Sequence, residues 1–296
     1  MHQASPNSPA DTAPSRLRKL WLCADDYGIS PAVNRAIRDL IARGRINATS
    51  VMVTTPSFST AQAQALLDLA GSDGRAAIGL HFTLTAPFRP AASTYRPVAR
   101  DGAFLGLADT LAAGLLRRLD PDALAAEAEN QFAAFRAAFG RQPDFVDGHQ
   151  HVHLLPQVSD AMLAAIKRMA PGAWLRQCGR VMPLWPRLAD PKGLLLDLLS
   201  LRLRRRCTAA RVPTNPAFAG TYDFKRATAF DALFGSFLQG LPDGSLVMCH
   251  PGFVDGELQR LDAFTTMREQ EHAFFAGKQF PALLAAHGIE LVRPGS

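Results

Sequence analysis

The sequence predicts an α/β fold built on parallel strands, and three observations support this prediction. Short apolar runs that are typical of buried strands alternate along most of the chain with longer segments that are typical of helices. Polar and titratable residues directly follow four of these runs. The length of 296 residues is close to that of a single (β/α) barrel. We therefore expect the active site at the edge where the parallel strands end.

The first elements are predicted from apolar runs and from residues that cap helices. Residues 1–16 are rich in Pro, Ser and Ala and are expected to form a disordered tail. A strand is expected over 20–24. Ser30 and Pro31 predict the start of a helix that runs to about residue 42, because Ser favours the N-cap and Pro the first helical position. Apolar and β-branched runs then predict further elements in the order strand, helix, strand, over 49–54, 60–70 and 76–82.

Two insertions interrupt the alternation of strands and helices. The first, at about 85–120, contains three prolines and is expected to be irregular, and the second lies at about 178–222. Elsewhere we expect strands over 145–148, 173–176, 245–250 and 289–292. Helices are expected over 121–139, 156–169, 227–239 and 261–276. No linker divides the chain, so a single domain is expected over 17–296.

Composition excludes several classes of protein. Hydrophobic residues make up 48% and charged residues 20%, which is usual for a globular domain. No run of roughly 20 apolar residues is present, so we expect no transmembrane segment. The cysteines stand far apart, which argues against a zinc ribbon or a disulfide framework and favours a cytoplasmic location. They are Cys23, Cys178, Cys207 and Cys249.

The formal net charge of +6 comes from one part of the chain. Between Cys178 and Val212 there are eight basic and two acidic residues, so the remainder is formally neutral. A protein that binds nucleic acid in general would carry a broader basic stripe. We interpret the segment as a local basic patch and expect no nucleic-acid partner.

A pair of carboxylates follows the first predicted strand. Asp25 and Asp26 would face opposite sides of a regular strand, but at a strand end both can reach one pocket. One would then bind a metal ion and the other would act as a general base. The alternative interpretation is a capping cluster ahead of the helix that begins near Ser30.

Three histidines follow the strand at 145–148. His149, His151 and His153 are spaced by two residues, so an extended segment would place all three on one face. One or two of them, with an Asp, would form an incomplete metal coordination sphere with room for water. The alternative is a histidine-rich surface turn. The remaining imidazoles would contact the metal ligands or the substrate.

His81 and His250 follow two other predicted strands. A lone histidine at a strand end is more often structural, and these two gain weight only because other candidate ligands occupy equivalent positions. One Asp and two His around a divalent cation, with a second Asp and an opposing His, would form a metal-dependent hydrolase. Zinc accepts such a set of ligands, and so do other divalent metals.

Four motifs together resemble the YdjC/ChbG-like carbohydrate deacetylases, over roughly residues 20–292. They occur in the same order and spacing as in that family: Ala24-Asp25-Asp26-Tyr27-Gly28-Ile29-Ser30, Gly79-Leu80-His81-Phe82-Thr83-Leu84, Asp147-Gly148-His149-Gln150-His151-Val152-His153 and Met248-Cys249-His250-Pro251-Gly252. The resemblance implies a distorted TIM-like (β/α) barrel, often a homodimer, with the active site at the C-terminal strand ends. It also implies removal of N-acetyl groups from amino sugars such as chito-oligosaccharides.

The resemblance also implies roles for individual residues. Asp25 is placed as the catalytic base and His250 as the general acid. One divalent metal ion, Mg²⁺ or Zn²⁺, is expected on three ligands: Asp26, His81 and His149. Substrate binding or support of the ligands is expected from four further residues: Asp147, His151, His153 and Arg176. Arg176 would either orient Asp25 or bind substrate.

Alternatives to this function stay open. The same centre would also suit another bond, such as a phosphoester or a cyclic amide, or an N-acetylglucosamine linked to a glycolipid or hopanoid. A third interpretation is a non-catalytic sugar- or lipid-binding protein. The leucines and arginines of 194–206 fit a basic amphipathic helix on a membrane surface. They also fit an ordinary core-packed or dimer-forming helix with a solvated basic end.

Overall fold

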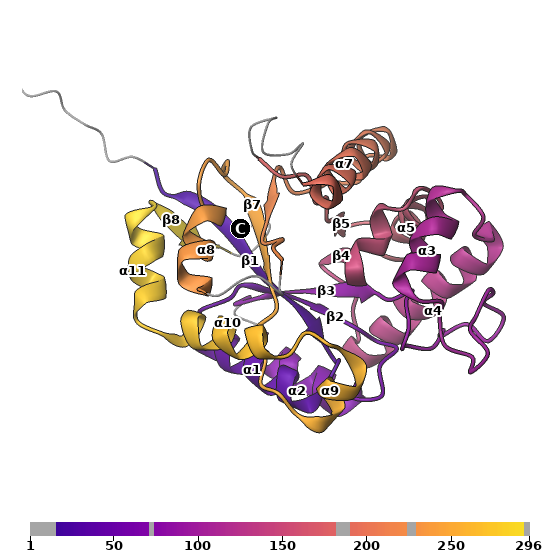
Figure 1. The fold of residues 1–296 in the computed structure, drawn as a ribbon, viewed down its shortest axis with the longest axis horizontal. Coiled ribbons are helices and arrows are strands. Elements are labelled where there is room, and N and C mark those ends of the chain that lie inside the picture. Colours follow the sequence, from indigo (N-terminus) through magenta and orange to yellow (C-terminus); the bar gives the residue numbers. More distant parts are fainter. Residues whose placement is uncertain (1–15, 71–73, 182–189, 224–228, 293–296) are drawn as a thin grey trace, which may run out of the picture.

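The computed structural model describes residues 16–70, 74–181, 190–223 and 229–292. Eight strands in these residues form one curved sheet with helices on its outer side, and every strand pairs in parallel (Figure 1). The order is β5-β4-β3-β2-β1-β7-β6, and β8 pairs with β1. The strands are β1 Arg18–Tyr27, β2 Ala48–Val51, β3 Ala77–Phe82, β4 Phe145–Gly148, β5 Trp174–Leu175, β6 Phe218–Ala219, β7 Ser245–Cys249 and β8 Ile289–Leu291.

The two end strands of this sheet are joined by a short contact and not by a continuous ladder. After β5, Arg180 forms a single parallel bridge with Phe218 of β6. Gln177 and Asn215 support this closure, because the Asn215 side chain accepts from the Gln177 backbone N–H at 2.9 Å and donates to its carbonyl at 3.0 Å. The predicted distorted (β/α) barrel is confirmed.

Capping residues start the helices where the sequence predicts. Ser30 accepts a hydrogen bond from the Val33 backbone N–H at the start of α1, and Asp120 caps α4 in the same way. Gly140 ends α4 in the left-handed conformation that favours glycine. The helices are α1 Pro31–Ala42, α2 Thr60–Ala70, α3 Leu107–Leu115, α4 Pro121–Phe139, α5 Pro156–Met169, α7 Pro191–Ala210, α8 Phe230–Phe237, α9 Gly256–Leu261, α10 Thr266–Ala276 and α11 Gln279–Ala286.

The structure differs from the sequence-based expectations in several segments. The first insertion contains α3, and the short elements β6, α9 and α11 were not predicted. The helix expected over 261–276 begins only at Thr266, because Asp262 is extended and its side chain accepts hydrogen bonds from the Phe264 backbone and from Arg268. The expected tail over 1–16 lies almost entirely outside the described residues.

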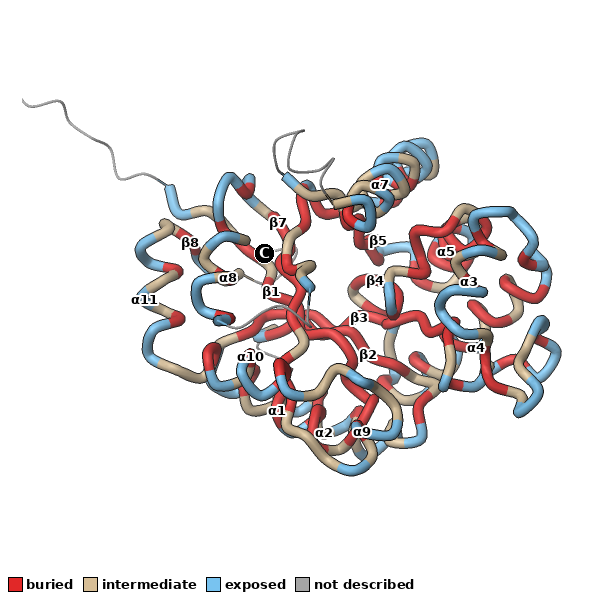
Figure 2. The backbone as a smooth tube through the Cα atoms, in the orientation of Figure 1, coloured by how far each residue is buried: buried red, intermediate tan, exposed pale blue. Residues whose placement is uncertain are grey.

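Aromatic side chains fill the barrel interior toward the N-terminal ends of the strands. The ring of Phe145 stacks on Trp174 with centroids 4.6 Å apart, and Trp174 meets Trp21 of β1 at 4.4 Å. Gly79 makes room for this cluster, because a Cβ there would lie 2.4 Å from the Phe145 ring. Buried residues follow the strands and the inner sides of the helices (Figure 2). The polar site residues are therefore confined to the opposite, C-terminal ends of the strands.

None of the described helices is both long enough and apolar enough to cross a membrane. All four cysteines are free and buried.

Candidate active site

An irregularity at the end of β1 brings two adjacent carboxylates into one site. The pairing register between β1 and β2 shifts between Ala24 and Tyr27, and Asp26 has a positive φ of 68°. Asp25 and Asp26 are each only 1% exposed. Gly28 follows with φ 103°, and a Cβ there would lie 2.6 Å from the Met52 carbonyl oxygen, so the turn depends on glycine. The backbone thus leaves the regular strand conformation, in which adjacent side chains point to opposite sides, and both carboxylates can enter one site.

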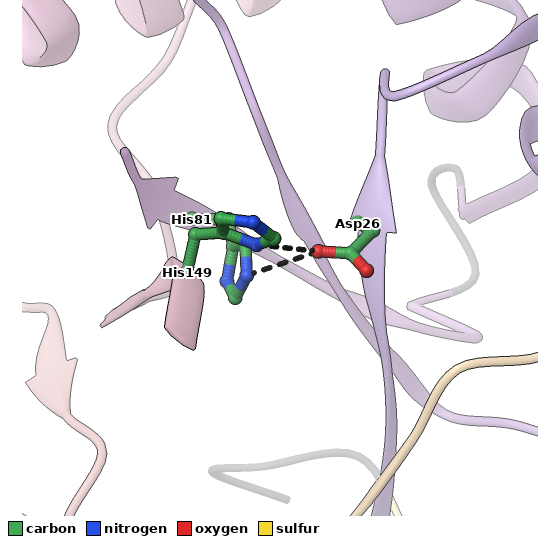
Figure 3. Close-up of side chains that lie close together, drawn as sticks. All are labelled: Asp26, His81 and His149. Atoms are coloured by element: carbon green, nitrogen blue, oxygen red, sulfur yellow. Dashed lines mark hydrogen bonds and ion pairs between the residues drawn. The ribbon is translucent and has the colours of Figure 1, made fainter. Parts of the chain in front are cut away.

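The first half of the site gathers two imidazoles around Asp26 (Figure 3). The Asp26 Oδ1 atom lies 3.3 Å from His81 Nε2 and 3.1 Å from His149 Nδ1. His81 belongs to β3, and His149 begins the short 3₁₀ segment η1 His149–Leu154 after β4. One ligand atom from each of the three residues lies within 4.8 Å of the other two. This spacing is compatible with a shared metal ion.

His81 is held from behind by a third carboxylate. Its Nδ1 atom lies 2.6 Å from Asp147 Oδ1 and 3.0 Å from Ser50 Oγ. Burial lowers the pKa of His81, but the carboxylates of Asp147, Asp26 and Asp25 together outweigh burial and raise that pKa to about 10. Both ring nitrogens of His81 therefore face carboxylates. A carboxylate behind a ligating histidine is a common support of metal sites.

Arg268 of α10 occupies the other oxygen of Asp26, and sequence reasoning missed it. Its Nη2 atom donates to Asp26 Oδ2 and to Asp262 Oδ2, each at 2.6 Å, and its Nε donates to the Phe264 carbonyl. Burial would raise the pKa of Asp26, but Arg268 and the hydrogen-bonding His149 hold it well below its usual range. Arg268 stands in an ordinary helical pattern, so the sequence carried no signal for this contact.

The second half of the site pairs Asp25 with Arg176, which follows β5. Arg176 donates to both oxygens of Asp25, at 2.7 and 2.6 Å, and also contacts Asp147. Ser50 Oγ donates to Asp25 at 3.1 Å. Burial would raise the pKa of Asp25, but the Arg176 guanidinium holds it well below its usual range. Asp25 is therefore ionised and fixed in orientation at neutral pH.

The predicted single face of three imidazoles is wrong. Gln150 and His151 have positive φ values of 54° and 60°, so the segment turns as η1 instead of extending. His153 is buried and its Nε2 donates to the Arg176 carbonyl at 3.0 Å, which supports the segment that carries this arginine. His151 Nδ1 lies 3.5 Å from Cys178 Sγ, and burial lowers the pKa of His151 to about 3. His151 is thus neutral at pH 7.

His250 follows β7, and an unpredicted carboxylate holds its backbone. Glu271 of α10 accepts the His250 backbone N–H at 2.5 Å and the Tyr222 hydroxyl at 2.6 Å. Burial raises the pKa of Glu271 to about 7 and lowers that of His250 to about 4. His250 is therefore neutral at pH 7. The sequence offered no signal for Glu271, which lies 21 residues from His250 in a helix.

Direct hydrogen bonds and ion pairs between predicted site residues join seven of them into one buried network. The seven are Asp25, Asp26, His81, Asp147, His149, His153 and Arg176. His151 and His250 are more exposed than these seven.

The donor set at Asp26 fits a divalent cation. One carboxylate oxygen and two imidazole nitrogens are ligands that Zn²⁺ and several other divalent metals accept. The buried network holds three carboxylates against two guanidiniums, and the raised pKa of His81 places the third positive charge on this imidazole, where a bound cation would take the place of the proton. The carboxylates are Asp25, Asp26 and Asp147, and the guanidiniums are Arg176 and Arg268.

A second group of closely spaced ligand atoms does not fit a metal. Cys23, Asp25 and Asp147 also offer atoms within 4.8 Å of one another. Arg176 Nη2, however, contacts all three of these residues. The guanidinium already provides the positive charge at that position.

The fold and the site together define a parallel α/β-barrel protein with a buried Asp/His centre at the C-terminal strand ends. The family model of YdjC-like proteins matches residues 19–286, and the chain belongs to this family. The resemblance seen in the four sequence motifs is thereby confirmed.

Individual relatives are similar over most of their length. The chain is 27% identical to a carbohydrate deacetylase of Geobacillus stearothermophilus, over 91% of this chain and 94% of the relative. It is 28% identical to a chitooligosaccharide deacetylase of Serratia marcescens, over 79% and 82%. A solved structure from Enterococcus faecalis V583, described as a candidate cellobiose-phosphate cleavage protein, superposes with a TM-score of 0.72. It is 22% identical and the match covers 94% of this chain and 97% of that one, which shows a shared fold.

Proposed function

We propose that the protein is a metal-dependent hydrolase that removes N-acetyl groups from amino sugars. The observation that carries this proposal is the convergence of Asp26, His81 and His149 beside the ion pair of Asp25 and Arg176. Membership of the YdjC-like family and the deacetylase names of the two relatives support the same reaction. In this proposal Asp26, His81 and His149 hold one divalent metal ion. Such an ion polarises a carbonyl group and acidifies water.

Asp25 is the proposed general base. Its ion pair with Arg176 keeps the carboxylate ionised and fixes its orientation, so it can accept a proton from the attacking water. The same ion pair makes Asp25 a weak base, because its pKa is low. A weak base is sufficient only where the water is made more acidic, which agrees with the need for a cation at Asp26.

His250 is the proposed general acid for the departing amine. Its neutral state at pH 7 follows from burial, so it must gain a proton before it can donate one, and the proton that Asp25 takes from the water is the one that His250 would pass to the amine. Negative charge that develops on the substrate would favour this protonation, because Asp25 and Asp26 already act on the imidazole in that direction. Glu271 fixes the backbone from which the imidazole projects.

Acetate release from purified protein tests the proposal. We would measure it with diacetylchitobiose, longer chito-oligomers and an N-acetylglucosaminyl lipid, before and after chelation and after return of Mg²⁺ or Zn²⁺. The expected result is acetate from at least one substrate, lost on chelation and restored by metal. Phosphate release from a sugar phosphate, or opening of a cyclic amide without acetate release, would overturn the assigned bond. Sugar binding that survives chelation without turnover would indicate a binding protein.

A further inference from the structure

Helix α7 presents an apolar stripe to the outside of the molecule. Its 20 residues span about 30 Å, and the buried side chains of its inner face include Ser200, Leu203 and Cys207. The opposite side carries three exposed leucines at a spacing of three residues. They are Leu195, Leu198 and Leu201, with exposed fractions of 36%, 57% and 45%.

The last turns of α7 carry exposed positive charge beyond the leucines. Arg204 and Arg205 are exposed, and no carboxylate of the described residues pairs with either side chain. Arg206, in contrast, is paired with Asp160 of α5 at 2.7 Å. The helix contains one acidic residue, Asp197, which pairs with Arg180. The outer face of α7 therefore combines leucines with arginines and has no acid of its own.

We infer that the outer face of α7 docks on an anionic lipid surface. The exposed leucines would enter the boundary of the acyl chains, and the long side chains of Arg204 and Arg205 would reach the headgroups. Anionic headgroups would supply the negative charge that the helix lacks. A second copy of this chain fits less well, because a symmetric contact through this face would bury arginines of both copies without a carboxylate from either helix.

This docking would bring the membrane close to the candidate active site. The inner face of α7 meets the segment after β5, where Ser200 Oγ accepts the Cys178 backbone N–H at 3.0 Å. Cys178 in turn lies 3.5 Å from His151. Figure 1 shows α7 beside β4 and β5, on the side of the barrel where these strands end. The inference concerns the surface and does not depend on the reaction proposed above.

Cosedimentation of the full chain with vesicles tests the inference. The probes are vesicles of phosphatidylcholine alone and of phosphatidylcholine mixed with phosphatidylglycerol. We expect binding to the anionic vesicles at low salt, weaker binding at high salt, and little binding to the neutral vesicles. Absence of binding to anionic vesicles at low salt would overturn the inference.

Matched variants locate the contact on α7. Arg204→Gln with Arg205→Gln should weaken vesicle binding by about fivefold for each charge removed. The control Arg136→Gln with Arg260→Gln removes the same charge from exposed positions on α4 and α9 and should leave binding nearly unchanged. Leu198→Ser should weaken binding, whereas Leu116→Ser, at 59% exposure, should not. Circular dichroism and thermal unfolding would show that each variant is folded.

Equal losses in the α7 and control variants would contradict the assignment to this helix. Light scattering distinguishes docking on lipid from docking on a second copy of the chain. A concentration-dependent dimer in the absence of lipid that Leu198→Ser dissociates would show that a second copy covers the face, and would overturn the lipid assignment.

Discussion

Asp25 and Asp26 are neighbours in the sequence but belong to different halves of the site. Asp25 is bound on both oxygens by Arg176, and its other contacts are hydrogen bonds. Asp26 divides its oxygens, with His81 and His149 on one and Arg268 on the other. The first arrangement fixes an ionised carboxylate and balances its charge with a guanidinium. The second leaves an oxygen among nitrogen ligands, where a metal ion can share it.

The difference shows that a short backbone irregularity allows two adjacent residues to have different partners in one site. In a regular strand one of the two carboxylates would point away from the site. The positive φ of Asp26 and the register shift after Ala24 turn both into the same pocket, each toward its own arginine. The comparison predicts that substitutions in the two halves have different consequences for metal and for turnover.

The largest effect is expected from the two aspartates themselves. Asp25→Asn should lower deacetylation by about a thousandfold or more while metal content is retained, because only the proton acceptor is removed. Asp26→Asn and His149→Ala should lose metal and turnover together. Metal content by mass spectrometry and acetate release, measured on the same preparations, check both statements. Near-normal turnover of Asp25→Asn would refute its role as base.

Arg176 should contribute mainly to folding stability. Arg176→Met removes the partner of two buried carboxylates, Asp25 and Asp147, and should lower the free energy of unfolding by about 3–5 kcal/mol. Urea denaturation measures this change. Arg168→Met is the matched control, because Arg168 pairs with Glu129 at the surface and its loss should cost less than about 1 kcal/mol. Equal costs for the two variants would contradict the proposed importance of the buried pair.

Much of the fold could be predicted because its signals are local. Ser30 with Pro31, and Asp120 with Pro121, specify helix starts through contacts within three residues, and the predicted helices begin there. Elements such as β6 and α11 could not be predicted, since two strand residues or eight helical residues carry too little pattern. The path of η1 was missed because positive φ values at Gln150 and His151 depend on tertiary contacts.

The residues of the site also fall into those that the sequence predicts and those that it does not. Its residues at the strand ends were recognisable, because a titratable side chain after an apolar run is unusual. Arg268 and Glu271 were not, because both stand in α10 among other charged residues and are buried only once the helix packs against the strand ends. The sequence shows which groups are present, whereas their burial and partners arise from packing.

Glu271 extends the comparison to a buried carboxylate whose pKa is raised. Burial is the largest influence on Glu271 and raises its pKa from 4.5 to about 7. The hydrogen bonds from Tyr222 and the His250 backbone, and the charge of Arg268, lower this pKa but do not outweigh burial. The charge of Asp25 raises it further. The folded protein therefore binds more protons than the unfolded chain between these values, so wild-type stability falls as pH rises through this window.

Glu271→Gln tests this pH dependence. The variant keeps an acceptor oxygen and removes the titration, so its stability relative to wild type should rise by about 3 kcal/mol between pH 4.5 and 7. Denaturation at a series of pH values measures the difference. Glu269→Gln, at an exposed position of the same helix, is the control and should leave the wild-type pH profile unchanged. A pH-independent difference for Glu271→Gln would contradict the raised pKa.

Asp147 connects the two halves, and its substitution has the smallest expected effect. One oxygen faces His81 Nδ1 and the other faces Arg176, so Asp147→Asn keeps an acceptor for His81 but removes the charge that both partners share. Metal affinity should fall by about 10–100-fold, as for other supports of ligating histidines. Competition with a chelator measures it. If Asp147 acts by supporting the metal ligand His81, excess metal should restore turnover to this variant. Excess metal should not restore turnover to Asp25→Asn, because that variant lacks the proton acceptor. Failure of metal to rescue Asp147→Asn would instead assign its role to the Asp25 half, through Arg176.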